Sequence, residues 1–585
     1  MKNLERLSAV ASGREKADVV YHGATVLNVF TREWEKKDVY LCGSYIAATA
    51  EPGVYKAEKE VDVSGKYITP GFVDAHVHIE SSMVLPGEFA RTVVQHGTTA
   101  IIADSHEIAN VLGPDAVRFM IRQSERAPVD IYFMIPSCVP ATNFEHTGGV
   151  ISVADITSIL KMPRVIGLGE MMNYPGIIGG DVGTLDKLSA VFNINGENAV
   201  IDGHAPLVRG KDLQAYRAVG IKTDHESHTF GEAEEKIRNG MYILIRQGSS
   251  ARDLALIVPE LAKSSLPVTK FCFCTDDKNI ADIIREGHID SNIRNAIHLG
   301  LKPEDAYTMA SLNAAECYHL PDSGAVCAGF KADFVILDDV DTVTIHSVVK
   351  SGREPDVSVP AVVTLPSTRS GSETEDLLYR ACHSVHLTES DITDTMFVDS
   401  VSPVFSRYAI AIQSGTLNTA KAELKDGEAS RGLEDGSLCR LAVIERHKKT
   451  GYHSLALLKG YGLNKGAIAM SIGHDSHNII CAGMQPADMR AAVAHICSMQ
   501  GGIAIVMNGK VIADLPLPVA GLMSNDAAEK VKLAHDALLP AARKLGIYEK
   551  IEPFVTLSFL ALTVIPELRL TDQGLFDVLQ WKFLK

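Results

Sequence analysis

The sequence lacks a disulfide framework, clustered basic residues and an apolar run long enough to cross a membrane. Its 10 cysteines are scattered without the spacing of a disulfide scaffold, which favours a reducing compartment. The formal net charge of -16 disfavours a nucleic-acid partner, because binding phosphates requires clustered Lys and Arg. The longest apolar segment, residues 554–566, is too short for a transmembrane helix, and residues 1–20 contain no apolar signal core. We therefore expect a cytoplasmic protein that binds neither nucleic acid nor membrane.

Two short sets of β-type segments flank a long middle part. At 585 residues the chain is too long for one hydrophobic core, so several domains are expected. Residues 17–63 contain short apolar runs between Gly and polar turns, and similar runs return at residues 324–337. Neither set has enough strands for a stable sheet alone. We predict one small β-sandwich built from residues 1–70 and 321–366.

The middle part, residues 71–320, alternates between strand-like and helix-like patterns. The first strand leads into His76, and later apolar runs lie at residues 98–104, 129–135, 165–170, 199–204, 221–225, 241–246 and 268–276. Amphipathic patterns such as residues 86–96, 233–239 and 281–285 occupy the gaps. Eight strands with intervening helices over roughly 250 residues are typical of a (β/α)8 barrel. The predicted fold class is α/β, with a (β/α)8 TIM-type barrel inserted in the composite β-sandwich.

The character of the sequence changes again in residues 367–585. Strands are expected at residues 396–407, 441–447, 467–472 and 502–511, and helices at residues 487–499 and 526–545. This mixture predicts a separate C-terminal α/β domain. No repeat, low-complexity tract or long linker is expected anywhere in the chain.

Two histidines end the first predicted barrel strand. Side chains alternate faces along a strand, so His76 and His78 point the same way and form half of a metal site. A single His-x-His pair also arises by chance, but more imidazoles and carboxylates follow the later strands. These residues are Asp104, His106, Glu107, Glu170, His204, Asp224, His225, Glu226, Asp276 and Asp277. Active sites of such barrels lie at the carboxyl ends of the strands, where these side chains fall.

The mixture of imidazoles and carboxylates indicates a catalytic transition-metal centre. These ligands suit Zn, Mn or Fe better than Ca, and no Cys cluster lies nearby to make a structural zinc site. Four His and two carboxylates exceed what one catalytic metal with an open position requires. They suit two metals bridged by a carboxylate and a hydroxide. Each residue alone also has a structural reading, since His204 could cap a turn and Asp276 a helix.

These motifs resemble the amidohydrolase superfamily and, within it, the bacterial adenine deaminases along nearly the whole chain. The matching segments are Pro70-Gly71-Phe72-Val73-Asp74, His76-Val77-His78-Ile79-Glu80-Ser81-Ser82-Met83, His106-Glu107-Ile108-Ala109-Asn110, Gly169-Glu170-Met171-Met172-Asn173, Cys274-Thr275-Asp276-Asp277 and His474-Asp475-Ser476-His477-Asn478. The family usually has Pro where this chain has Ser105. The resemblance implies a metal-centred barrel combined with a β-sandwich built from both of its flanks.

The resemblance also implies an enzyme that converts adenine and water to hypoxanthine and ammonia in purine salvage. Two divalent transition metals are the implied cofactors, with Mn²⁺ expected and Fe²⁺ or Zn²⁺ as alternatives. Adenine is the implied small-molecule partner, and we expect a homodimer. The implied metal ligands are His76, His78, His204, His225, Asp276 and Glu170, the last replacing the carboxylated lysine that bridges two metals in many relatives.

The chemistry of deamination requires carboxylates in two roles. Metal-bound water loses a proton near neutral pH and attacks C6 of the purine. The ring nitrogen beside C6 must gain a proton as the aromatic ring is disrupted. Asp276 is expected to take the proton of the water and pass it towards the departing amine. Glu107 is expected to serve the ring nitrogen, with Asp104 as the alternative.

Four further residues are candidates for substrate binding. Arg246 and Ser249 follow the seventh predicted strand, although a helix cap is an equally good interpretation of Arg246. His474 and His477 lie in a short polar loop of the C-terminal domain, which a surface turn would explain. Our hypothesis places this loop at the mouth of the barrel, where it contacts the purine, excludes water or holds a further metal.

Two other functions remain open. A cyclic-amide hydrolase such as a hydantoinase would use the same metals on a carbonyl group, but its bridging lysine is missing here. A non-catalytic barrel scaffold would lack ligands, and none is missing from this sequence. The small zinc deaminases are excluded, because no Pro-Cys-x-x-Cys motif accompanies a His-x-Glu.

Overall fold

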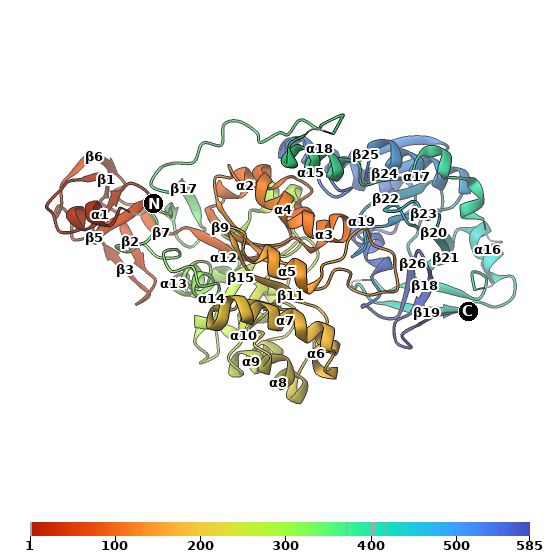
Figure 1. Ribbon diagram of the computed structural model, residues 1–585, viewed down its shortest axis with the longest axis horizontal. Helices are drawn as coiled ribbons and strands as arrows, with labels where there is room; N and C mark the ends of the chain where they lie inside the picture. Colours follow the sequence, from red (N-terminus) through yellow and green to blue (C-terminus); the bar gives the residue numbers. More distant parts are fainter. Residues whose placement is uncertain (1–2, 370, 399–403, 415, 585) are drawn as a thin grey trace.

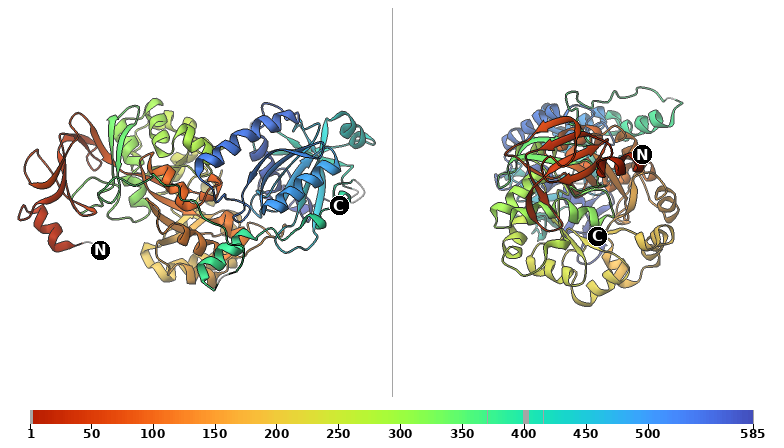
Figure 2. Two further views of the ribbon diagram at one scale, coloured as in Figure 1. Left: turned by 90° about the horizontal axis from the view of Figure 1, so that it is seen from above. Right: turned by 90° about the vertical axis from the view of Figure 1, so that its left-hand side faces the viewer.

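The computed structural model describes the chain apart from residues 1–2, 370, 399–403, 415 and 585. A β-rich part lies at one end, a barrel in the middle and a mixed α/β part at the other end (Figure 1). The view from above shows the same order along one long axis (Figure 2). None of the helices in the described ranges is long and apolar enough to pass through a bilayer.

The β-rich end is built from both flanks of the barrel, as the sequence predicted. One sheet has the order β5-β4-β1-β6, and the second has the order β17-β16-β7-β2-β3. The bounds are α1 (Leu4–Ala11), β1 (Ala17–His22), β2 (Thr25–Asn28), β3 (Glu33–Lys36), β4 (Asp38–Cys42), β5 (Tyr45–Ala50), β6 (Ala57–Asp62), β7 (Tyr67–Pro70), β16 (Phe334–Asp339) and β17 (Thr344–Val349). Strand β16 pairs antiparallel with β7, so the chain returns to the sheet that it left. Tyr21 and Phe334 join the two flanks in one core, with ring centroids 5.1 Å apart.

The middle part is a closed barrel of parallel strands. The strands are β8 (Phe72–Val77), β9 (Thr98–Asp104), β10 (Asp130–Ile135), β11 (Val165–Met171), β12 (Ile201–Gly203), β13 (Thr223–Asp224), β14 (Tyr242–Arg246) and β15 (Phe271–Cys274). They pair in the orders β12-β11-β10-β9-β8 and β13-β14-β15. A parallel bridge between Val77 and Asp276 joins these two sheets on one side. On the other side, the backbone N–H of Lys222 donates to the oxygen of Ile201 at 3.4 Å.

Helices surround the barrel (Figure 1), and the carboxyl ends of its parallel strands lie together at one end. They are α2 (Pro86–Val94), α3 (His106–Leu112), α4 (Pro114–Gln123), α5 (Val153–Ile159), α6 (Tyr174–Gly179), α7 (Val182–Asn195), α8 (Gly210–Ala218), α9 (Phe230–Arg238), α10 (Leu254–Leu261), α11 (Ile280–Glu286), α12 (Ile289–His298), α13 (Pro303–Met309) and α14 (Leu312–Cys317). Strand β9 is buried along its whole length. Its Ala100 and Ile102 fill the barrel interior, whereas Ile101 packs outward against the helices. Burial on both faces explains why the barrel strands are continuous apolar runs in the sequence.

The far end contains the α/β part that the sequence predicted, built on a sheet of order β19-β18-β21-β20-β23-β22-β24-β25. Its elements are α15 (Glu373–Cys382), β18 (Tyr408–Ile412), β19 (Thr419–Glu423), α16 (Glu428–Asp435), β20 (Leu438–Ile444), β21 (His453–Lys459), β22 (Ala467–Met470), β23 (Ile479–Gly483), α17 (Pro486–Met499), β24 (Gly502–Met507), β25 (Lys510–Pro516), α18 (Ala528–Lys544), α19 (Pro553–Ser558), β26 (Leu568–Thr571), β27 (Gly574–Asp577) and β28 (Lys582–Phe583). Alternate residues of β20 enter different cores. Leu441 and Val443 join the core that includes α18, whereas Ala442 and Ile444 join the core beneath α17.

Two strand predictions in this part are wrong. Residues 396–407 do not form one strand, because Asp394–Phe397 is a 3-10 turn and β18 begins at Tyr408, while residues 399–403 lie outside the described range. Phe397 is buried in the core beneath α17, and a short buried apolar run does not distinguish a strand from a turn. The single strand predicted for residues 502–511 is instead the hairpin of β24 and β25. It turns at Asn508 and Gly509, whose φ angles of 55° and 71° suit a tight two-residue turn.

A long connection joins β17 to α15, although no linker was predicted. In its described residues, 350–369 and 371–372, no helix or strand occurs. The connection runs along α2, where the backbone N–H of Ala361 donates to Glu88 Oε2 at 2.7 Å. Arg91 Nη1 donates to the backbone oxygen of Val357 at 3.4 Å. Side chains of α2 therefore hold this segment, and such contacts leave no periodic pattern in the sequence.

Candidate metal centre

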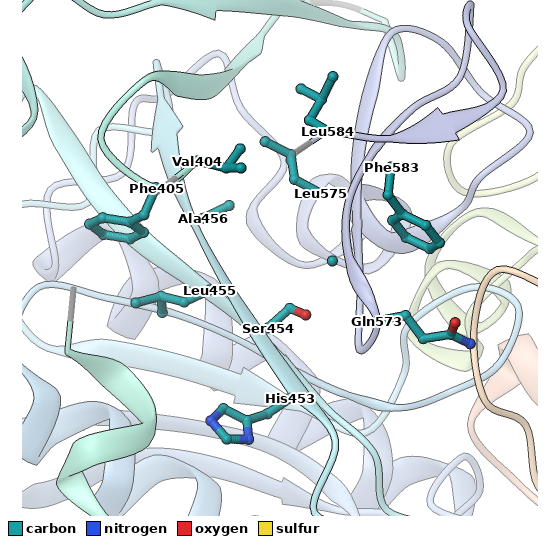
Figure 3. Close-up of a pocket in the computed structure, with 11 residues that line it drawn as sticks. Val404, Phe405, His453, Ser454, Leu455, Ala456, Gln573, Leu575, Phe583 and Leu584 are labelled. Atoms are coloured by element: carbon teal, nitrogen blue, oxygen red, sulfur yellow. The ribbon is translucent and has the colours of Figure 1, made fainter. Parts of the chain in front are cut away.

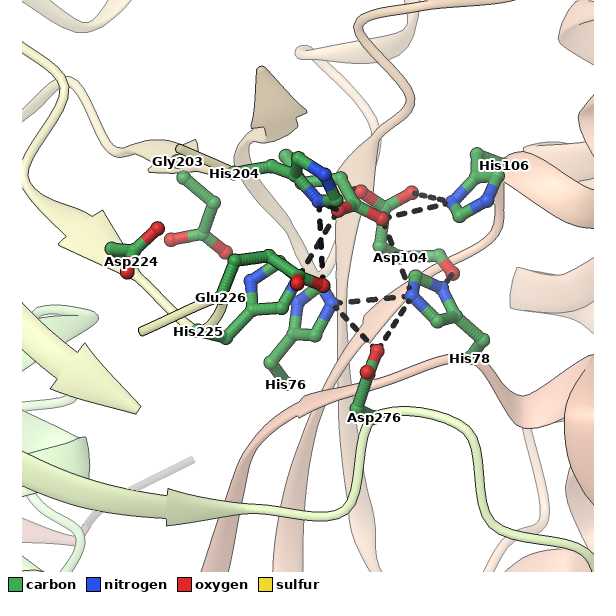
Figure 4. Close-up of polar contacts among 12 residues, drawn as sticks. His76, His78, Asp104, His106, Gly203, His204, Asp224, His225, Glu226 and Asp276 are labelled. Atoms are coloured by element: carbon green, nitrogen blue, oxygen red, sulfur yellow. Dashed lines mark hydrogen bonds and ion pairs between the residues drawn. The ribbon is translucent and has the colours of Figure 1, made fainter. Parts of the chain in front are cut away.

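The carboxyl ends of the barrel strands carry a buried cluster of imidazoles and carboxylates (Figure 4). His76 belongs to β8 and His78 follows it, and their Nε2 atoms lie 3.2 Å apart. His78 Nδ1 lies 2.9 Å from the backbone oxygen of Asp104, which orients the ring with Nε2 towards the cluster. The two imidazoles at the first strand end therefore meet at one point.

Glu170, in β11, connects imidazoles that come from several strand ends. Its Oε1 lies 3.3 Å from His78 Nε2 and 3.3 Å from His106 Nδ1. Its Oε2 lies 2.8 Å from His204 Nδ1 and 3.2 Å from His225 Nε2. Each oxygen of one carboxylate thus contacts its own pair of imidazoles, which is the arrangement expected of a bridging ligand.

Asp276 follows β15 and lies against the first strand end. Its backbone N–H donates to the oxygen of His76 at 3.0 Å, and its Oδ1 lies 3.2 Å from His78 Nε2. Arg246 Nη1 donates to its Oδ2 at 3.1 Å. Burial alone raises the pKa of Asp276, but the hydrogen bond with His78 and the charge of Arg246 outweigh burial. The pKa of Asp276 therefore lies below its usual value, and the carboxylate is ionised at neutral pH.

Asp104, at the end of β9, lies behind the carboxylate of Glu170. Its Oδ2 accepts the backbone N–H of Glu170 at 2.9 Å. A Cβ on Gly169 would come within 1.9 Å of the same oxygen, so this close approach requires glycine. Burial raises the pKa of Asp104 above its usual value. Asp104 therefore supports the position of Glu170 directly.

The donor set of the cluster fits divalent cations. Ligand atoms lie within 4.8 Å of one another in the groups His76–His225–Asp276, His76–His78–Glu170 and Glu170–His204–His225. The rings of His76 and His225 are stacked, with centroids 4.2 Å apart. Among the described residues, the Nδ1 atoms of both rings are buried without a hydrogen-bond partner. Crowded lone pairs in a buried site repel one another unless cations lie between them, so these residues could hold metal ions.

Two residues join the cluster although the predicted ligand set omits them. His106 contacts Glu170 as described above, and its ring centroid lies 4.4 Å from that of His78. Glu226 Oε1 lies 3.7 Å from His225 Nε2 and also contacts Arg246. Both residues directly follow predicted strand ends. That position was the signal from which the sequence could have assigned them.

The two residues predicted after the seventh strand lie in different surroundings. Arg246 is buried among carboxylates, with its Nε 2.8 Å from Asp253 Oδ2 in addition to the contact with Asp276. Ser249 Oγ donates to Asp282 Oδ2 at 2.7 Å and accepts the backbone N–H of Asn279 at 3.0 Å. The structure therefore places Arg246 within the cluster and Ser249 at the start of helix α11.

The C-terminal loop of residues 473–478 reaches the carboxyl end of the barrel. His474 Nδ1 lies 2.9 Å from Glu107 Oε1, and His477 Nε2 contacts Glu107 Oε2. His106 Nε2 lies 3.3 Å from Glu107 Oε1. All of these side chains are buried. Glu107 therefore connects the metal-type cluster of the barrel to a loop of the C-terminal part.

A pocket of about 250 Å³ lies elsewhere, between β21 and the β26–β27 hairpin (Figure 3). Its walls include Leu455, Leu575 and Phe583, and His453 is the titratable side chain among its lining residues. One imidazole without a nearby carboxylate or second ligand offers no catalytic arrangement. The candidate site is therefore the cluster at the barrel end and not this pocket.

Known proteins resemble the chain along its full length. A model described as the Amidohydrolase family matches residues 67–357, and one described as the Adenine deaminase C-terminal domain matches residues 416–582. Adenine deaminases of Clostridium acetobutylicum and Geobacillus kaustophilus are each 42% identical, over 98% of this chain and 98% of theirs. That of Listeria monocytogenes serotype 4b is 40% identical, over 99% of this chain and 98% of its own.

Solved structures share less sequence with the chain. A crystal structure of an adenine deaminase is 16% identical, with a TM-score of 0.43, and covers 55% of this chain and 90% of that chain. A β-aspartyl dipeptidase from Fervidobacterium islandicum AW-1 is 17% identical, with a TM-score of 0.44, and covers 60% and 100%. The similarity to the curated relatives is therefore the stronger of the two.

Proposed function

The chain belongs to the adenine deaminase family of the amidohydrolases and deaminates adenine, and we propose that two divalent metal ions at the barrel end carry this reaction. The proposed ligands are His76, His78, His204, His225, Asp276 and a bridging Glu170. The observation that carries the proposal is the division of contacts at Glu170. One oxygen lies 3.3 Å from His78 Nε2 and the other 2.8 Å from His204 Nδ1. Mn²⁺ suits this mixture of imidazole and carboxylate, as Fe²⁺ and Zn²⁺ do.

Asp276 is the proposed proton carrier of the reaction. Bound divalent cations would lower the pKa of a water molecule and stabilise developing negative charge. Asp276 would accept the proton of that water on Oδ1 and deliver it to the departing amine. Its lowered pKa keeps it in the ionised form that can accept a proton. Arg246 holds the other oxygen at 3.1 Å, so Oδ1 stays directed at the cluster.

Glu107 is the proposed acid for the purine ring. Attack at C6 makes the adjacent ring nitrogen basic, and that atom needs a proton donor. Imidazoles surround Glu107, with His474 Nδ1 at 2.9 Å and His106 Nε2 at 3.3 Å from Oε1. When the C6 carbonyl forms, the second proton of the water leaves, and these rings can relay it back to the carboxylate to restore the acid. The alternative, Asp104, has a raised pKa but lies behind Glu170, whose backbone N–H it accepts at 2.9 Å, whereas Glu107 lies where the C-terminal loop meets the cluster, and this location favours Glu107 for the role.

The wider setting proposed for the enzyme is purine salvage in the cytoplasm by a homodimer. The net charge of -16 supports a small neutral substrate over a nucleic acid. Size-exclusion chromatography with light scattering tests the dimer. The relatives decide against the cyclic-amide hydrolase and the non-catalytic scaffold.

Metal titration of the apoenzyme tests the two-metal proposal. Ammonia release from adenine should reach its maximum at two Mn²⁺ ions per chain, measured beside elemental analysis. Hydantoin and dihydroorotate serve as control substrates, and neither ring should open. Full activity with one metal per chain would overturn the proposal.

A further inference from the structure

A fully buried arginine lies behind the loop that reaches the barrel. Arg446 is 0% exposed and follows strand β20. Its Nε donates to the backbone oxygen of His477, its Nη2 to that of Ala520 at 2.8 Å, and its Nη1 to Ser384 Oγ at 3.1 Å. Within the described part of the chain, no carboxylate forms an ion pair with this guanidinium. The N–H donors of Arg446 therefore join three segments of the chain, those of Ser384, His477 and Ala520.

The surroundings of Arg446 fit a planar guanidinium. A Cβ on Gly521 would lie 2.9 Å from both Nη1 and Nη2, so the fork packs directly on glycine backbone. A guanidinium holds several N–H donors in a rigid plane, whereas a lysine ammonium is a compact point charge. Burial lowers the pKa of Arg446 to about 9, because desolvation penalises the charged form more than nearby Glu445 stabilises it. The geometry of the donors, and not charge pairing, accounts for an arginine here.

Arg446 and the next residue hold two consecutive carbonyl groups of the loop. His447 Nε2 lies 2.7 Å from the backbone oxygen of Ser476, and Arg446 binds the following oxygen, that of His477. His477 has a φ of 56°, and its Nε2 contacts Glu107 Oε2. The hydrogen bonds to these two carbonyl groups fix the backbone from which the ring of His477 extends. They therefore determine where this ring contacts Glu107.

We propose that Arg446 is a positioning residue for the deamination of adenine, acting through His477 on Glu107. The proposal rests on the proposed role of Glu107 as the acid for the ring nitrogen. A small shift of the loop of residues 473–478 away from its present contacts would misplace Glu107 for proton transfer. The proposed metal ligands would stay in place. Misplacement of a catalytic group by about 1 Å costs roughly 100-fold in rate. The loss should therefore appear in kcat more than in KM or metal content.

Arg569 is a matched control in the same part of the molecule. It is also 0% exposed, and it donates to the backbone oxygens of Ile565 at 2.7 Å, Leu417 at 2.7 Å and Pro566 at 3.0 Å. It lies in β26, and none of its hydrogen bonds in the described residues reaches the loop of residues 473–478. A merely structural role would give both arginines the same consequences on substitution.

The first experiment compares metal-loaded Arg446→Lys with Arg569→Lys by Tm, metal content, kcat and KM. Both substitutions should lower Tm, but only Arg446→Lys should lower kcat, by about 100-fold, at wild-type metal content. Ser384→Ala removes one hydrogen bond from Arg446 and gives a milder variant if Arg446→Lys does not fold. Ser384→Ala should also lower kcat, by a smaller factor than Arg446→Lys does. Wild-type kcat in a folded Arg446→Lys, or in Ser384→Ala where that variant is the one tested, would overturn the proposal.

The second experiment tests the route through His477. The double variant Arg446→Lys/His477→Ala should have the kcat of His477→Ala alone. Once the ring of His477 is gone, the position that Arg446 gives to it has no further effect on Glu107. Effects that multiply would overturn the positioning role and leave the proposed function intact. Wild-type kinetics in His477→Ala would show that the loop takes no part in the reaction. That result would overturn both the action of His477 on Glu107 and the positioning role of Arg446. The two failures are therefore distinguishable.

Discussion

The two ends of the barrel bury charge in opposite ways. At the amino end, Asp130 of β10 faces the β-sandwich and lies 2.8 Å from Lys331 Nζ and 3.0 Å from Lys350 Nζ. Lys350 also lies 2.8 Å from Asp333 Oδ2. Every carboxylate in this group has an ammonium partner from the same chain. This end is complete without any added ion and connects the barrel to the sandwich.

The cluster of imidazoles around Glu170 at the carboxyl end has no such balance. Glu170 is surrounded by imidazoles, and Arg246 is the permanently charged partner of Asp276. Asp104 Oδ1 and His225 Nδ1 are buried without hydrogen-bond partners among the described residues. A buried arrangement of this kind is unfavourable unless a cation enters it. In this protein, charged side chains that are paired with one another stabilise the fold. Buried imidazole nitrogens and carboxylate oxygens that converge without such partners indicate the reactive site.

The largest effect should come from Glu170→Gln. The amide keeps the shape of the side chain but removes the charge that would hold two cations together. We expect ammonia release to disappear and metal affinity to fall by about 10- to 100-fold or more. Elemental analysis after dialysis measures the metal, and circular dichroism checks folding. A Glu170→Gln protein with wild-type metal content and rate would show that Glu170 is not a metal ligand. The unpaired groups at the carboxyl end would then not indicate a metal site.

Asp276→Asn should follow, as a sharper test of proton transfer. Asparagine cannot accept the proton of the attacking water, so kcat should fall by about 10²- to 10⁴-fold in enzyme reloaded with metal. KM should change less, because binding of the purine does not require this proton transfer. Steady-state kinetics with a parallel metal assay makes the distinction. A rise in KM at unchanged kcat would instead assign Asp276 to substrate binding.

Arg246→Lys should have an intermediate effect on rate. The guanidinium contacts Glu226, Asp253 and Asp276 at once, and a lysine cannot keep all three contacts in one plane. We expect a loss in kcat of about 10-fold, with the protein still folded. Arg252→Lys is the control, because Arg252 is a nearby arginine, 42% exposed, that pairs with Glu286. Equal kinetics in the two variants would show that Arg246 does not orient Asp276.

The sequence could group the side chains at the carboxyl end of the barrel for a physical reason. Parallel strands bring their carboxyl ends to one place, so residues such as His76, Glu170 and Asp276 can be grouped from local patterns alone. The contact of Glu107 with His477 depends on how two separately folded parts dock. No periodicity encodes that docking, and a sequence motif could only suggest the loop. For the same reason, the connection between β17 and α15 left no signal in the sequence, since side chains of α2 hold its residues Val357 and Ala361.

Asp130→Asn should have the smallest effect on activity and a measurable one on stability. Asparagine cannot balance Lys331 and Lys350, so unfolding should become easier by about 1–2 kcal/mol, a value reduced from that of a fully buried pair because Asp130 is partly exposed. Metal content and kcat should match the wild type. Asp338→Asn is the control, because the pair of Asp338 with Lys66 is exposed and such pairs contribute little. Loss of metal from Asp130→Asn would break the distinction between the two ends.

The stability effect of Asp130 should also depend on pH in a defined direction. Burial alone raises the pKa of Asp130, but Lys350 and Lys331 outweigh burial, so its pKa in the folded protein lies below the usual value. A carboxylate with a lowered folded pKa stabilises the protein fully above its unfolded pKa of about 3.9, and this stabilisation is lost as pH falls through the folded pKa. The Tm difference between wild type and Asp130→Asn should therefore be largest near neutral pH and shrink towards zero in acid. Thermal unfolding of both proteins between about pH 7 and pH 3 measures this difference. A difference that grows as pH falls would mean that the lysines do not hold Asp130 ionised, and that this end of the barrel is not the charge-paired one.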